Sequence, residues 1–177
     1  LAVTFRWMAD YQEAGIATAM VTMREFKSWD VSLEELYYTA VHNMQRLFPI
    51  CVESMEKLYL DSIENNLIRD KVREEIEELD MPKLPMLVLT NDQKINGATS
   101  LLYPECLKHL SKEYEGGFYI LPSSVHEVIL IPDNADIPTD ELKAMVRYAN
   151  TTCVTDEELL SYSVYSYDAL LDEVSVI

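Results

Sequence analysis

Two short stretches near the start of the chain resemble β-strands, and the first of them alternates hydrophobic and polar residues. They are Ala2 to Met8 and Ile16 to Thr22, and both are rich in Val, Thr or aromatic side chains. The polar stretch from Asp10 to Gly15 separates them. Because antiparallel strands are commonly joined by a short polar turn, we predict a β-hairpin here.

Helical spacing replaces this alternation in the next segment. A short helix is predicted from Met23 to Trp29, and Ser32 with Glu35 forms an S-x-x-E capping box that starts a longer one. The longer helix is expected to end near Phe48, because Pro49 follows it. The hydrophobic residues that recur at helical spacing are Leu33, Leu36, Tyr37, Ala40, Val41, Met44 and Leu47.

A charged segment follows, from Val52 to Leu79, and it also keeps hydrophobic residues at helical spacing. We expect one or two helices in it. Pro82 and Pro85 then interrupt the pattern, and the composition changes from helical to strand-like. The best internal boundary of the chain is therefore the stretch from Asp80 to Pro85.

A second hairpin with a helix after it is predicted beyond this boundary. Met86 to Thr90 and Ala98 to Tyr103 resemble strands on either side of a polar turn at 91–97. Pro104 favours the first turn of a helix, which should span Glu105 to Tyr114 and end before the Gly pair at 116–117.

A third unit of the same kind is predicted next. Its strands are Phe118 to Leu121 and Val125 to Ile131, and its helix is capped by Thr139 and ends near Asn150. A short helix from Asp156 to Leu160 is expected before the C-terminal strand. That strand alternates through Tyr162, Val164, Tyr165 and Tyr167.

These elements predict an α+β fold with an antiparallel sheet built from successive hairpin-plus-helix (ββα) units and a helical segment in the middle. Residues 1–80 would hold the first hairpin and the helical segment, and 81–177 the second and third units and the C-terminal strand, all in one compact globule. Gly15 and Gly97 both precede an Ala-Thr pair at the start of a predicted strand. This similarity fits either an internal repeat or chance.

Composition and charge indicate a globular protein and argue against a membrane-spanning or nucleic-acid-binding one. The chain has 49% hydrophobic residues, 25% charged residues and only four Gly, which is typical of a packed globule. No hydrophobic run reaches the roughly 18 residues of a membrane-spanning helix. The formal net charge of −17 repels phosphate backbones, so we expect no nucleic acid partner and no membrane. An unknown protein partner with basic residues could use the acidic surface, although solubility explains it more simply.

The cysteine pattern indicates a reducing compartment. Cys51, Cys106 and Cys153 are far apart and include no CxxC pair, so neither a disulfide framework nor a cysteine zinc site is predicted. We therefore expect a cytoplasmic protein with structural thiols. Leu1 is not an initiator Met, and a missing upstream part is expected.

The chain has only three histidines that could bind a metal or act as a general base. His42 and His109 lie at ordinary positions of predicted helices, and we interpret both as surface or core-edge residues. We expect no bound metal and no cofactor, because no ligand pair has zinc spacing.

The densest cluster of reactive side chains is the run from Ser123 to Glu127. In a strand, Ser124 and His126 would share one face and Glu127 would point to the other. These three residues are the candidate catalytic residues of a hydrolase. The alternative, which we favour, is a structural hinge into a buried strand, with the serines bonding loop amides. The sequence contains no H-E-x-x-H, G-x-S-x-G or phosphate-binding glycine motif.

Two amides in the predicted turn at 91–97 have a similar double interpretation. Asn91 and Asn96 could bind a ligand, but Asn and Gly are also the residues that hairpin turns select for positive φ. We favour the turn.

Most of the chain resembles the C-terminal part of a family of uncharacterised proteins of anaerobic gut bacteria (Firmicutes), known only as a domain of unknown function. The resemblance is strongest in Leu89 to Ala98 and Phe118 to Pro132, and it extends to Leu142 to Arg147, Asn150, Asp156 to Ser161 and Tyr165, and to Gly15 to Thr18 and Leu33 to Tyr37. Where the family tends to have Gly after a Tyr-Pro pair, this sequence has Glu105. The resemblance implies no activity, substrate or catalytic residue.

The function predicted from the sequence is therefore open between two classes. The first is a non-catalytic intracellular module that binds a protein or a ligand through an acidic surface or a sheet edge. The second is an unrecognised hydrolase-like enzyme that uses Ser124, His126 and a carboxylate from elsewhere in the chain. Whether these side chains line a concave pocket distinguishes the two.

Overall fold

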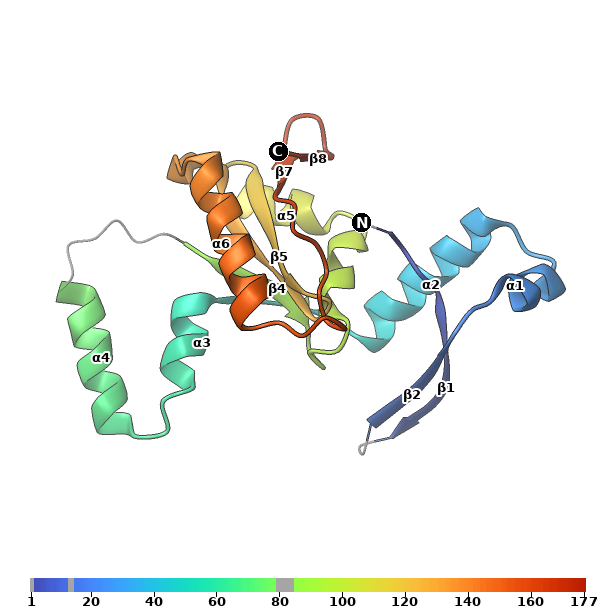
Figure 1. The fold of residues 1–177 in the computed structure, drawn as a ribbon, viewed down its shortest axis with the longest axis horizontal. Helices are drawn as coiled ribbons and strands as arrows, with labels where there is room; N and C mark the ends of the chain where they lie inside the picture. Colours follow the sequence, from blue (N-terminus) through green and yellow to red (C-terminus); the bar gives the residue numbers. More distant parts are fainter. Residues whose placement is uncertain (1, 13–14, 79–84) are drawn as a thin grey trace. The chain divides into compact units, whose positions relative to one another are not determined.

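The computed structural model describes residues 2–12, 15–78 and 85–177 of the chain. They separate into two compact units, Leu1–Leu47 and Phe48–Ile177 (Figure 1). Helices and antiparallel strands occur in both units, so the predicted α+β class is confirmed. Most of the predicted boundary near residue 80 lies at positions 79–84, outside the described residues, and the single compact globule stays a prediction.

The first unit contains the predicted hairpin and two helices. Its elements are β1 (Arg6–Gln12), β2 (Gly15–Met20), α1 (Met23–Trp29) and α2 (Leu33–Leu47). The capping box of α2 is formed as predicted: the Glu35 backbone N–H donates to Ser32 Oγ (3.1 Å), and the Ser32 N–H donates to Glu35 Oε2 (2.8 Å). The bonds from Ser32 lower the pKa of Glu35, because they stabilise the carboxylate.

The second unit is built on a six-stranded sheet in which all neighbours are antiparallel. The strand order is β3-β4-β6-β5-β7-β8. The strands are β3 (Ile50–Ser54), β4 (Leu87–Asn91), β5 (Phe118–Ser124), β6 (Glu127–Pro132), β7 (Tyr165–Asp168) and β8 (Glu173–Val176). The β5–β6 hairpin therefore lies in the middle of the sheet, and β3 and β8 are its edges.

Helices pack on both faces of this sheet. On one face, Leu142 and Val146 of α6 (Thr139–Thr152) form a buried cluster with residues of β5, β6 and the segment before β7, namely Leu121, Ile131 and Val164. Because alternate strand residues point to opposite faces, Phe118 points away from this cluster, and the ring of Tyr114 meets it at 5.9 Å between centroids. Tyr114 ends α5 (Cys106–Glu113), so α5 covers the other face with η1 (Gly97–Leu102), a 3₁₀ helix.

The helical segment between β3 and β4 consists of α3 (Met55–Asp61) and α4 (Asn66–Glu78). The expected helices are thus present, but the start of that segment is wrong, because residues 52–54 belong to strand β3. The helical spacing of the residues did not reveal that β3 pairs with β4, which is more than 30 positions away in the sequence. Ser54 ends the strand and caps α3 by accepting a hydrogen bond from the Lys57 N–H (3.1 Å).

The predicted strand at Ala98–Tyr103 is also wrong, since the chain forms η1 there. Both edges of β4 are already occupied by β3 and β6, which leaves no position beside β4 for a returning strand. Gly15 therefore begins a strand and Gly97 begins a 3₁₀ helix, which removes the apparent repeat and the second ββα unit. The helix expected at 156–160 is a turn followed by irregular chain.

The remaining predicted elements are present to within a few residues, but Thr139 is the first residue of α6 and not its cap, since Pro138 precedes the helix. Helix α5 starts one residue after Glu105, whose backbone has φ 60°, a value that favours glycine. The positive φ explains why glycine suits position 105. In this chain the Glu105 carboxylate contacts Lys108 Nζ at 2.9 Å. In the described part of the chain, no helix is long and apolar enough to cross a membrane.

Candidate functional site

The turn of the β5–β6 hairpin carries the three candidate catalytic residues. Ser124 Oγ accepts a hydrogen bond from the backbone N–H of His126 (3.0 Å), which closes the turn. Ser123 Oγ donates to Glu127 Oε1 (3.3 Å). Both serine hydroxyls are therefore used in contacts within the turn, and such local bonds are what serines near strand ends commonly make.

The imidazole of His126 joins this turn to two other loops. Its Nδ1 accepts a hydrogen bond from the backbone N–H of Asn96 (3.1 Å), and its Nε2 lies 3.6 Å from Glu158 Oε1. The Val125 N–H also donates to the Glu158 carbonyl (2.9 Å). The contacts with residues 96 and 158 hold together the loop after β4, the β5–β6 turn and the segment after α6.

The structure thus brings a carboxylate from elsewhere in the chain to His126, but in an arrangement that differs from a nucleophile–base pair. In a serine-histidine-carboxylate triad, one imidazole nitrogen faces the carboxylate and the other accepts the serine proton. Here the nitrogen that does not face Glu158 accepts the Asn96 N–H instead. The Ser124 hydroxyl accepts its hydrogen bond from the backbone N–H of His126 rather than from the imidazole ring.

The two candidate binding amides lie in the loop after β4 and have different environments. Asn91 is fully buried: its Nδ2 donates to the Ile95 carbonyl (2.8 Å), and its Oδ1 accepts from the N–H groups of Gln93 (3.1 Å) and Ile95 (3.3 Å). Asn96 is exposed and has φ 50°. Asn91 therefore holds the loop in shape, and Asn96 supplies the positive φ that the loop needs.

Gly97 lets this loop approach the β5–β6 turn. A Cβ at this position would collide with Thr90 Oγ1 and with the carbonyl oxygen of His126, and it would lie 2.9 Å from the Asn91 backbone nitrogen. Thr90 Oγ1 itself donates to that His126 carbonyl (2.8 Å). Close approach of backbone is a requirement that only glycine meets.

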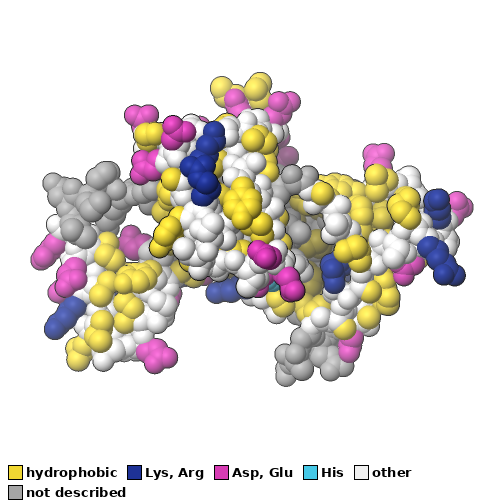
Figure 2. Space-filling view, viewed as in Figure 1, with side chains coloured by type: hydrophobic (Ala, Val, Ile, Leu, Met, Phe, Trp, Pro, Cys, Tyr) yellow, Lys and Arg dark blue, Asp and Glu magenta, His cyan; other side chains and the backbone are white. Residues whose placement is uncertain are grey.

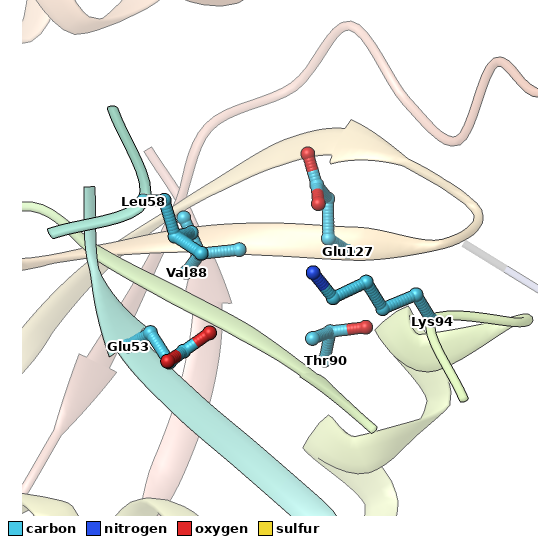
Figure 3. Close-up of a pocket in the computed structure, with 6 residues that line it drawn as sticks. All are labelled: Glu53, Leu58, Val88, Thr90, Lys94 and Glu127. Carbon is cyan, nitrogen blue, oxygen red and sulfur yellow. The ribbon is translucent and has the colours of Figure 1, made fainter. Parts of the chain in front are cut away.

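A small pocket opens beside Glu127 on the sheet face that carries Val88 and Thr90 (Figure 3). Its lining residues are Glu53, Leu58, Val88, Thr90, Lys94 and Glu127. The Lys94 side chain points into the space between the two carboxylates. Lys57, which donates to Glu53 at 2.6 Å, lowers the pKa of the Glu53 carboxyl, and Lys94 adds to this effect.

The size of this pocket limits its chemistry. Its volume is about 30 Å³, whereas pockets for small organic ligands are roughly 300–1,000 Å³. Ser124 and His126 are absent from its lining. The pocket has room for ordered water but not for a substrate of ordinary size.

Thiols and metal ligands form no further centre in the part of the chain that the structure describes. No group of three His, Cys, Asp or Glu side chains converges there as a metal site. Cys51, Cys106 and Cys153 are free, and burial raises the pKa of the Cys106 thiol to about 11. A thiol with so high a pKa is protonated and unreactive at neutral pH.

The β7–β8 hairpin is a further candidate, and its turn exposes two adjacent leucines. Leu170 is 96% exposed and Leu171 is 67% exposed. Asp168 Oδ1 accepts hydrogen bonds from both of their backbone N–H groups, at 2.8 and 3.0 Å. The leucines are therefore presented to solvent by a defined turn. In Figure 2, hydrophobic side chains lie over this turn at the top of the view, with acidic side chains beside them.

Contacts to the body of the unit anchor this hairpin at both ends. Tyr167 is only 2% exposed, and its hydroxyl donates a hydrogen bond to Asp172 Oδ1 (2.8 Å). The other oxygen of this carboxylate, Oδ2, lies 3.9 Å from Lys108 Nζ. Burial, together with the Asp172 carboxylate, raises the pKa of Tyr167 to about 12. At the other end, the Ile177 N–H donates to the Val164 carbonyl (3.0 Å). The sequence analysis did not predict this hairpin; the only local signal for its turn is the pair Asp168 and Asp172, since Asp is a residue that turns favour.

Together these features define an α+β domain with a central β5–β6 hairpin tied to its neighbours and an exposed hairpin at one sheet edge. The chain belongs to a family of unknown function (DUF5688), whose model matches residues 1–169. The predicted resemblance to a domain of unknown function is confirmed at this level, and β8 follows the matched residues. No curated protein and no solved structure matches the chain.

Proposed function

We propose that this chain is a non-catalytic, intracellular protein-interaction module. The observation that carries the proposal is the pair of leucines at 170 and 171, which an ordered and doubly anchored turn holds in water. Exposing large apolar side chains on a fixed turn is unfavourable unless a partner covers them. Because the turn is already ordered, a partner would bind without the entropic cost of fixing it.

The charge of the second unit indicates which partners are favoured. Residues 48–177 contain 25 acidic and ten basic residues, a formal net charge of −15. Such a field attracts basic surfaces and accelerates their association, and it repels nucleic acid. We therefore propose a basic protein partner, in a bacterial cytoplasm, as the resemblance to gut-bacterial proteins supports.

The hydrolase alternative rests on one observation, the 3.6 Å approach of Glu158 to His126 Nε2. The bonds of Ser124 and of the imidazole Nδ1 weigh against it, because each satisfies a backbone N–H. The small volume of the neighbouring pocket weighs against it as well.

Two assays test the proposal: capture of partner proteins tests the interaction module, and covalent labelling of serine tests the hydrolase. Tagged full-length chain is used to capture proteins from a bacterial lysate, and each captured protein is then purified and titrated against the chain. The matched baits are a Leu170→Ser/Leu171→Ser variant and a Tyr148→Ser control, since Tyr148 is also exposed, on α6. The same chain is treated with a fluorophosphonate, a reagent for activated serines.

We expect a partner that binds wild type and the Tyr148→Ser control equally, saturates at a defined stoichiometry, and binds the double variant at least about tenfold more weakly. We expect no stoichiometric labelling of Ser124. Labelling of Ser124 that requires His126 would favour the hydrolase, and a partner indifferent to both leucines would contradict the proposed site.

A further inference from the structure

The edge strand β8 has backbone groups that no strand of the described structure uses. The Ile177 N–H donates to the Val164 carbonyl, so positions 177 and 164 form a hydrogen-bonded pair. Such pairs alternate along an antiparallel ladder, which makes Ser175–Ser166 and Glu173–Asp168 the next ones. The N–H and C=O groups of Val174 and Val176 therefore point away from β7, and β8 ends the sheet.

The side chains of β8 distinguish the two faces that an added strand would meet. Val174 and Val176 pair with Tyr167 and Tyr165, so they share the face of these two tyrosines and extend its apolar surface. Both valines are more than half exposed, at 52% and 63%. Glu173 and Ser175 point to the opposite face. An added strand thus meets an apolar row on one side and an acidic, polar row on the other.

We infer that β8 binds an extended segment of a partner protein in which apolar and basic residues alternate. The segment adds a strand to the sheet by hydrogen bonds to Val174 and Val176, and its apolar side chains pack beside the two valines. Its Lys or Arg side chains lie on the face of Glu173. This inference rests on the proposed interaction function and names the partner's chemistry.

Charge complementarity selects this occupant over a second copy of the chain. Natural edge strands avoid pairing with one another by being short and charged, and β8 has four residues with Glu173 at its start and Asp172 before it. Two copies would also bring together two units of net charge −15, whereas a basic segment is attracted to them.

The test uses the full chain and a blocked heptapeptide of alternating lysine and valine, followed by titration calorimetry and by hydrogen exchange of backbone amides. A glutamate-valine heptapeptide is the matched control peptide. The key variant is Val174→Pro, which removes an outward N–H and leaves the bonds to β7 intact, since proline is tolerated at such edge positions. Val174→Thr keeps the N–H and the branched side chain and serves as the control variant.

We expect the lysine peptide to bind with an affinity that falls as salt rises, and to slow exchange at Val174 and Val176. Val174→Pro should weaken binding by about tenfold or more, Val174→Thr should change it little, and Glu173→Lys should reduce the preference for the lysine peptide. The inference is overturned if wild type binds both peptides equally, or if the lysine peptide binds Val174→Pro as tightly as it binds wild type. Self-association of wild type that Val174→Pro abolishes, measured by sedimentation velocity, also overturns it and identifies a second copy as the occupant. If the peptide fails while the two leucines still control capture from lysate, the edge strand is refuted and the interaction module is not.

Discussion

The backbone N–H of Asn96 donates a hydrogen bond to Nδ1 of His126, at 3.1 Å, across a sequence separation of 30 residues. This bond joins the loop after β4 to the turn of the central hairpin. It gives the imidazole a structural partner at the nitrogen that a serine nucleophile would need.

His126→Ala should lower the free energy of unfolding by about 1 kcal/mol, because the Asn96 N–H loses its acceptor. The cost is at the low end of the usual range since the side chain is 37% exposed and water can reach the site. Urea denaturation measures it. His109→Ala is the control and should change stability less, because the bond of the His109 ring is local, from Nδ1 to the carbonyl of Glu105 just before α5 (2.7 Å). Equal stability of wild type and His126→Ala would contradict the structural role.

Gly97→Ala should destabilise the second unit by on the order of 3 kcal/mol, because its Cβ would collide with backbone at His126 and with Thr90 Oγ1. Gly116→Ala is the matched control, since its Cβ would meet only the side chain of Asp133, which can move. Thermal denaturation compares the two variants. If Gly97→Ala is as stable as Gly116→Ala, the loop does not need glycine at position 97.

Asn91→Ala should cost about 2–3 kcal/mol, because it removes a fully buried side chain that bonds two partly buried N–H groups and one carbonyl of the loop. Asn96→Gly should leave stability nearly unchanged, since glycine accepts φ 50° without strain. Hydrogen exchange of residues 92–97 should be faster only in the Asn91 variant. Fast exchange in both variants would show that the Asn96 side chain also holds the loop.

Tyr167 makes stability depend on pH in the alkaline range. Its pKa is raised to about 12 in the folded chain and is about 10 in an unfolded one, so folding favours the protonated phenol. This stabilisation is complete below about pH 10 and is lost as the pH rises towards about 12. The free energy of unfolding of wild type should therefore fall more steeply over this range than that of Tyr167→Phe. Tyr148→Phe, at an exposed position, should behave like wild type, and identical slopes for all three chains would contradict the assignment.

Local signals were sufficient to predict much of the fold. The capping box at Ser32, the proline at 104 and the apolar run at 128–131 act through neighbouring residues, and the elements they predict are present. The pairing of β3 with β4 was not predictable in this way, because it depends on a contact across the intervening helices. The strand predicted at 98–103 fails for the same reason, since only the sheet order shows that β4 has no free edge.

The candidate sites show the same difference between local signals and long-range contacts. The sequence predicted that Ser124 and His126 share one face of a strand, which is wrong, because β5 ends at Ser124 and residues 125–126 form the turn before β6. Sequence spacing also could not show that Asn96 and Glu158 contact the imidazole from two other loops. The exposure of Leu170 and Leu171 was not predicted either. Two leucines beside a strand are more often core residues than surface ones, and only the finished packing distinguishes the two cases.

The measurement that tests the central claim most directly is hydrogen–deuterium exchange of the full chain with and without its captured, purified protein partner. If the chain acts by binding, amides of the β7–β8 hairpin at 168–176 should become protected, and those of the β5–β6 turn at 123–127 should be unchanged. Protection confined to 123–127, with no change at 168–176, would contradict the account and place the functional site at Ser124 and His126.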